Sequence, residues 1–204
     1  MKRTVFALFV SVALFGSDIA LAAKSECKIA QDSVDDFTHE HVVVTEWEGL
    51  SHPVRPGGRE MTGFVSAVSN GDGHFLRVNI EHFWSKRTLP TEDDMQNSIS
   101  VAERAELLVA MVDGSVVTLH ASKATVGKTT IEDRPKPHSG DSFWLMTKAT
   151  AHYALNDATE QVLTAQDSKA LRMTTESGNR DLRFYSKSFD EISRVIKCVT
   201  GAIK

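Results

Sequence analysis

Residues 105–120 place the strongest constraint on the fold, because two apolar runs in this segment flank the pair Asp113-Gly114. An Asp-Gly pair accepts the positive φ angles of a two-residue type I′ turn, which joins neighbouring antiparallel strands. A β-hairpin is therefore expected. Both of its faces are apolar, so we predict that it is covered on both sides. In that register one face holds Leu108, Ala110, Val112, Val117 and Leu119, and the other holds Leu107, Val109, Met111 and Val116.

Other segments alternate with the period of two that a strand imposes on its side chains. Residues 37–47 form one such segment, and residues 74–84 form a second, in which Leu76 faces inward and Arg77 faces outward. Further strands are expected at residues 143–153, 170–175 and 181–186, the last two joined as a hairpin. The segments 48–62 and 122–141 contain Pro and Gly and are expected to be surface loops.

Two helices are expected late in the chain. Asn156 can accept hydrogen bonds from the free amides of the following turn, which predicts a short helix that ends near residue 166. Ser188 and Glu191 have the spacing of a capping box before an apolar stripe at helical spacing. We therefore predict an α+β fold that is mainly antiparallel β: a sandwich-like sheet with the C-terminal helix packed on it and a short helix before the last hairpin.

The N-terminus has the three parts of a secretory signal peptide: a basic start, an apolar stretch at residues 5–15, and mostly small residues at 20–23, with cleavage expected after Ala22 or Ala23. The apolar stretch is shorter than the roughly 20 residues that a spanning helix needs. We therefore predict a cleaved signal peptide at residues 1–22. A single globular domain at residues 23–204 should follow, soluble in the periplasm or outside the cell and without a membrane span.

The charge of the mature chain argues against one class of partner. Removing residues 1–22 takes away Lys2, Arg3 and Asp18 and leaves 21 basic and 26 acidic side chains, a formal net charge of −5. A surface that neutralises nucleic-acid phosphates needs clustered Lys and Arg, whereas here the basic residues are scattered among acidic ones. Nucleic acid is therefore excluded as the expected partner.

The chain has two cysteines, Cys27 near the mature N-terminus and Cys198 near the C-terminus. In an oxidising compartment an isolated pair predicts a disulfide. A bridge between residues so far apart in the sequence would restrict the unfolded chain by roughly 5 kcal/mol in the chain-entropy model.

Two short motifs resemble catalytic ones but are incomplete. Gly127-Lys128-Thr129 matches the end of a phosphate-binding P-loop, but Ser122 occupies the position of the required first glycine. Gly140-Asp141-Ser142 resembles the nucleophile block of GDS-type esterases, whose histidine base lies late in the chain, but the last histidine here is His152. Neither motif supports an enzymatic activity.

Two pairs of residues are candidates for ligand binding. His39 and His41 lie two apart on an expected strand, so both imidazoles could face one zinc ion, although none of the six other histidines has the spacing of a third ligand. The alternative is a structural pair that donates to backbone carbonyls, and the sequence favours it. Arg55 and Arg59 flank a Pro-Gly-Gly turn that could present guanidinium groups to an anion, although the same composition forms an ordinary turn.

The absence of a complete catalytic set in the sequence favours a non-enzymatic binding module that contacts a protein, an envelope component or a small ligand through its loops. No cofactor is predicted. The alternative is a metal-dependent hydrolase that uses His39 and His41, with zinc as its cofactor. The three tryptophans, Trp47, Trp84 and Trp144, are expected in the core or at its rim.

Overall fold

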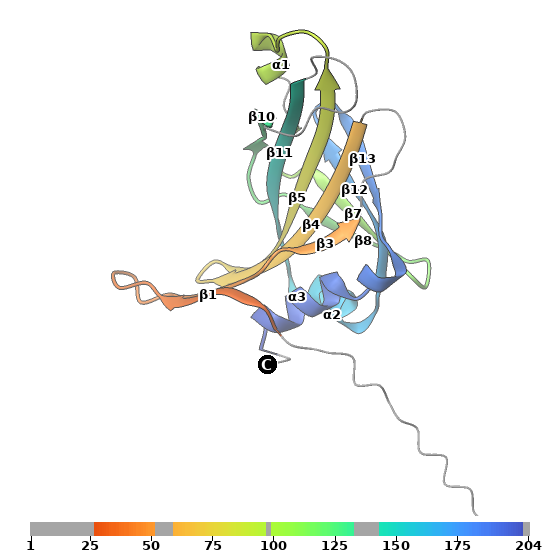
Figure 1. The fold of residues 1–204 in the computed structure, drawn as a ribbon. Coiled ribbons are helices and arrows are strands. Elements are labelled where there is room, and N and C mark those ends of the chain that lie inside the picture. The colour runs from red at the N-terminus through yellow and green to blue at the C-terminus, as the bar shows by residue number, and fades with distance from the viewer. Residues whose placement is uncertain (1–26, 52–58, 97–98, 133–142, 202–204) are drawn as a thin grey trace, which may run out of the picture.

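The computed structural model describes residues 27–51, 59–96, 99–132 and 143–201, and strands dominate these ranges (Figure 1). Every strand pairing within them is antiparallel. The elements in chain order are β1 (Ile29–Val34), β2 (His41–Thr45), β3 (Glu48–Ser51), β4 (Arg59–Asn70), β5 (Gly73–Lys86), α1 (Glu92–Gln96), β6 (Ser100–Val101), β7 (Glu106–Met111), β8 (Val116–His120), β9 (Thr125–Val126), β10 (Lys128–Glu132), β11 (Phe143–Ala154), α2 (Asp157–Ala165), β12 (Ser168–Thr175), β13 (Gly178–Arg183), the 3-10 turn η1 (Ser186–Ser188) and α3 (Glu191–Val199).

The larger sheet is built on three long strands, β4, β5 and β11, which pair along their lengths. Its order is β1-β2-β4-β5-β11-β10, and β3 also pairs with β4. Side chains alternate between the two faces of a strand, so every second cross-strand row points into the core. Val65, Val78 and Ala151 form one such row, and all three are fully buried.

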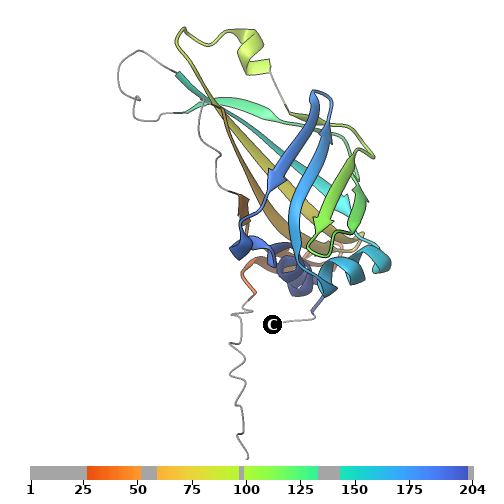
Figure 2. The ribbon, with the colours of Figure 1, turned by 90° about the vertical axis from the view of Figure 1, so that its right-hand side faces the viewer.

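The smaller sheet has the order β13-β12-β7-β8 and faces the inner side of the larger one (Figure 2). The two sheets are joined at one edge by a bridge between Ala121 and Tyr153. At the other edge, the backbone N–H of Tyr185 donates to the carbonyl of Leu50 over 3.4 Å. The strands therefore curl around one shared apolar core.

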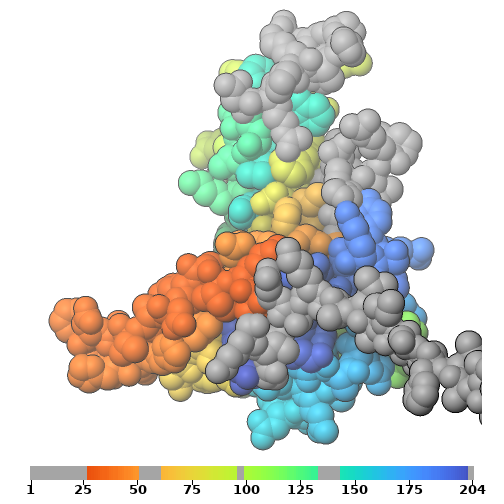
Figure 3. All heavy atoms as spheres, turned by 60° about the horizontal axis from the view of Figure 1, so that its bottom comes forward, coloured from red at the N-terminus to blue at the C-terminus, as the bar shows by residue number. Residues whose placement is uncertain are grey.

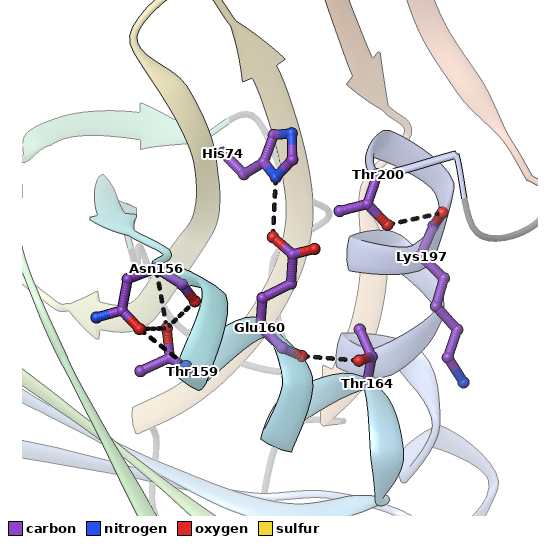
Figure 4. A network of polar contacts seen from close by, with 7 residues as sticks. All are labelled: His74, Asn156, Thr159, Glu160, Thr164, Lys197 and Thr200. Carbon is purple, nitrogen blue, oxygen red and sulfur yellow. Dashed lines mark hydrogen bonds and ion pairs between the residues drawn. The ribbon is translucent and has the colours of Figure 1, made fainter.

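Helices α2 and α3 close one end of this core (Figure 1). Asn156 caps α2 as predicted: its side chain accepts from the backbone N–H of Thr159 over 2.9 Å (Figure 4). From the middle of α2, Glu160 reaches back to β5, where its carboxylate lies 2.8 Å from Nδ1 of His74. The apolar stripe of α3 faces the core, with Ile192, Val195, Ile196 and Val199 all buried.

The two ends of the described chain meet beside α3. Cys27 and Cys198 are joined as a disulfide with a Cα–Cα distance of 5.5 Å, which confirms the predicted pairing. Next to it, Glu48 lies 3.1 Å from the Lys28 ammonium and 3.3 Å from the Arg194 guanidinium. The disulfide and these ion pairs fasten the start of β1 to the last helix.

The predicted mainly antiparallel α+β fold is confirmed, with α2 before the last hairpin and α3 at the C-terminus. The predicted capping role of Ser188 is wrong, because Ser188 lies in η1 and its hydroxyl donates to the carbonyl of Gly49. No helix in the described ranges is long and apolar enough to cross a membrane. The predicted signal peptide, residues 1–22, lies outside the described residues.

The hairpin of β7 and β8 exists, but its predicted register is wrong by one residue. Met111 donates to the carbonyl of Ser115, so the loop has three residues, and Gly114 takes a φ of +95° at its end. A slip of one residue exchanges the faces. The buried face holds Leu107, Val109, Met111, Val117 and Leu119, while Val112 and Val116 are exposed. The smaller sheet is therefore covered on one side by the core, not on both.

Candidate functional site

The hairpin of β1 and β2 extends away from the body of the molecule (Figure 1). Only Val43 and Val44 of β2 pair with β4, so the outer part of the hairpin has no strand pairing with the larger sheet. The Glu40 carboxylate lies against Gly71 in the turn between β4 and β5. All six residues of β1 are exposed. Figure 3 shows the same projection from below, in red and orange. We call residues 29–41 the projecting arm.

The turn at the tip of the arm is held by hydrogen bonds of Asp35. Its carboxylate accepts from the backbone N–H groups of Phe37 and Thr38 over 2.9 and 2.7 Å. These bonds favour the ionised form and lower the pKa of Asp35. A backbone hydrogen bond of 2.9 Å from the His39 N–H to the Asp35 carbonyl closes the turn, and His39 takes a φ of +59°. The tip is thus a defined turn.

Phe37 is the most exposed large apolar side chain in the described ranges, at 94%. The turn that holds its backbone gives the ring no apolar neighbour to cover it. Leaving a Phe side chain in water instead of burying it costs about 1.5–3 kcal/mol. An aromatic ring presented in this way on a fixed turn is the geometry of an interface anchor.

The projecting arm is also strongly acidic. Residues 29–41 contain four carboxylates and neither Lys nor Arg; the acidic residues are Asp32, Asp35, Asp36 and Glu40. Asp32 and His41 are the one described ion pair within the arm, with Oδ1 and Nε2 2.6 Å apart. The arm therefore presents an aromatic ring surrounded by negative charge.

The predicted metal ligands both lie on this arm, but they do not share a strand face. His39 belongs to the turn and has a positive φ, while His41 is the first residue of β2. The premise of two side chains pointing the same way is wrong, because the strand begins four residues later than expected. In the described part of the chain, no three His, Cys, Asp or Glu side chains cluster as metal ligands.

Of the predicted anion-binding pair, Arg55 lies outside the described residues, and Arg59 is the first residue of β4, opposite Trp84 on β5.

A surface pocket of about 530 Å³ lies between β3, β4, η1 and the start of α3. Glu191 lines this pocket, and burial raises its pKa although its hydrogen bond to Arg194 acts in the opposite direction. Arg194 also pairs with Glu48, so both carboxylates are already engaged. These charges join α3 to β3 and serve the fold.

The sequence did not indicate Phe37 as a surface residue of special interest, because its alternating pattern made Phe37 the first residue of an expected strand. Nor did it single out Arg77, whose guanidinium carbon lies 4.5 Å above the ring of Trp47. Trp47 itself is 38% exposed and sits at the rim, as predicted. No family model, curated protein or solved structure matches this chain.

Proposed function

We propose that this chain is a non-enzymatic binding module of the periplasm or extracellular space that docks onto a protein partner through its projecting arm. The observation that carries the proposal is Phe37, a 94% exposed ring on a turn fixed by Asp35. The disulfide between Cys27 and Cys198 supports the compartment, since such bridges persist mainly outside the cytoplasm.

The ordered turn favours docking because the ring is already presented. Association has to immobilise side chains and loops, and a preformed turn reduces that cost. Burial of the Phe37 ring in a partner would then add an anchor of the kind that dominates interface energies.

The negative charge of the projecting arm indicates which kind of surface on a partner would bind it. Four carboxylates around one aromatic ring fit an apolar pocket bordered by Lys and Arg. An anionic lipid surface would repel the same carboxylates, so a membrane fits the arm poorly.

Site-specific photocrosslinking in the cells that naturally make the protein tests the proposal. Benzoylphenylalanine replaces Phe37, and the matched control replaces Leu89, which is 71% exposed on the loop after β5. We expect one dominant protein adduct from position 37 that is absent from position 89. With that partner purified, Phe37→Ala should weaken binding at least about 10-fold and Leu89→Ala should leave it unchanged.

A charge reversal on the projecting arm provides a second test. Asp36→Lys should weaken the same complex and flatten its dependence on salt, because the carboxylates steer the arm toward a basic rim. The same adducts from both positions, or none from position 37, would show that the arm is not a docking element.

A further inference from the structure

A second cluster lies away from the projecting arm, on the outer face of the larger sheet. Ser66 on β4 and His152 on β11 are both directly opposite Arg77 on β5, so the three side chains form one cross-strand row. Opposed side chains on neighbouring strands have Cβ atoms about 5 Å apart. Trp47, between β2 and β3, completes the row by stacking with Arg77. We call these four residues the Arg77 row.

Lys123 adds a further positive charge at the His152 end of this row. The residue before it, Ser122, donates its backbone N–H to the carbonyl of His152 over 2.8 Å and its hydroxyl to the same atom over 3.2 Å. These bonds fix Lys123 next to β11. Burial, Arg77 and Lys123, in that order, lower the pKa of His152.

Arg77 differs from Arg172 and Arg194, which both form ion pairs with carboxylates. Arg172 forms two bonds of 2.7 Å with Asp181, and Arg194 contacts Glu191 and Glu48. Among the described residues, no carboxylate forms an ion pair with Arg77, although burial lowers the pKa of its guanidinium. A half-buried cation without an anion is unfavourable in the protein alone.

Two polar atoms in the row are also unsatisfied. Nε of Arg77 and Oγ of Ser66 are buried and have no hydrogen-bond partner within the described structure. Buried polar atoms nearly always have a partner, so unsatisfied ones in a single row indicate a group that the protein alone does not supply.

We propose that the Arg77 row, together with Lys123, binds an oxyanion, namely the phosphate, sulfate or carboxylate group of a ligand. The Arg77 guanidinium offers the N–H pairs that match two oxygens of such a group, and Trp47 holds its plane. Lys123 supplies a second charge from the far side of His152. None of these residues belongs to the projecting arm, so the site does not depend on the docking proposal.

The site should bind more tightly at lower pH. The groups that face His152 are Arg77 from β5 and Lys123 from the segment after β8, and both are cations. An anion between them offsets their repulsion and favours the imidazolium, so binding raises the pKa of His152. By linkage, protonation of His152 then strengthens binding of the anion as the pH falls through the imidazole range.

NMR titration of the mature protein tests the proposal, with inorganic phosphate, sulfate and acetate added separately at constant ionic strength. We expect saturable shifts of the His152 ring and of the Arg77 Nε–H signals, and a higher His152 pKa at saturation. Comparison of the three anions shows whether the site prefers a tetrahedral group or a carboxylate.

Variants provide the controls. Arg77→Gln should weaken the binding at least about 10-fold, and Lys123→Gln, at an exposed position, should weaken it about 2- to 5-fold without affecting the fold. Arg183→Gln, on the outer strand of the smaller sheet, is the matched control and should bind like the unaltered protein. Linear shifts that never saturate with any of the three anions would overturn the proposal, as would equal shifts in the Lys123→Gln and Arg183→Gln proteins.

Discussion

Tyr153 is a large side chain in the core whose polar atom lacks a partner. The residue is fully buried on β11, and its hydroxyl has no hydrogen bond in the described structure. Burial raises the pKa of Tyr153, so the phenol is neutral at neutral pH. A buried donor without an acceptor costs about 1–3 kcal/mol, which the ring must offset by packing.

Tyr153→Phe should therefore raise the free energy of unfolding by about 1 kcal/mol, because it removes the unsatisfied hydroxyl and keeps the ring. Tyr153→Leu is the control for packing and should lower it by about 2 kcal/mol, since it leaves a cavity. Urea unfolding of the three proteins gives both values. A less stable Tyr153→Phe protein would show that the hydroxyl has a bonding partner.

At the scale of elements, Gly63 lies where β13 of the smaller sheet packs against β4 of the larger one. It lies on the inner face of β4, where a β-carbon would be 2.3 Å from Cδ1 of Leu182 on β13. Leu182 is itself buried and cannot move freely into solvent. The absence of a side chain at Gly63 thus lets β13 pack against β4.

Gly63→Ala should lower the free energy of unfolding by about 1–2 kcal/mol through overpacking. Leu182→Val in the same chain should recover part of that loss, although Leu182→Val alone is destabilising. Gly49→Ala, on the strand paired with β4, is the control, since its β-carbon would meet Phe64 at an ordinary 3.9 Å. Additive effects of the two changes would mean that the sheets do not meet at Gly63.

The elements could be predicted from the sequence better than their registers. Alternation indicated the first half of β5, where Leu76, Val78 and Ile80 are buried and Arg77 between them is not. A run rich in strand-forming residues indicated β11. The register of β7 and β8 was not predictable, since Asp113-Gly114 fits a three-residue loop as well as a two-residue one. The core decides between them, because only the three-residue loop puts Leu107, Val109 and Met111 on the same face as Val117 and Leu119.

The candidate sites were harder to predict for a related reason. The outward direction of Arg77 followed from alternation, but its neighbour His152 lies on a strand far away in the sequence. Phe37 fitted the alternating pattern of a strand, and its exposure depends on a turn set by one side chain, Asp35. Alternation within one segment predicts which face of a strand a side chain lies on. Which side chains of other strands lie beside it depends on the tertiary fold.

For the whole molecule, the disulfide joins the base of the projecting arm to the helix that closes the core. Cys27 precedes β1, and Cys198 lies in the last turn of α3, at a sequence separation of 171. A crosslink over so long a loop acts mainly by restricting the unfolded chain. It also has a local role, since β1 is an exposed edge strand that pairs with β2 alone among the described strands.

Cys27→Ser combined with Cys198→Ser should lower the free energy of unfolding by about 2–5 kcal/mol and the melting temperature by about 10 °C. Hydrogen exchange should speed up first in β1, because without the bridge it is held by its hydrogen bonds to β2, by the bond from the Glu46 N–H to the Lys28 carbonyl and by the ion pair of Lys28 with Glu48. The amides of β5, in the centre of the larger sheet, should keep their protection until global unfolding. The reduced unaltered protein is the control and should match the double variant. Equal melting temperatures of the oxidised protein and the double variant would show that the core and the ion pairs hold the two ends without the bridge.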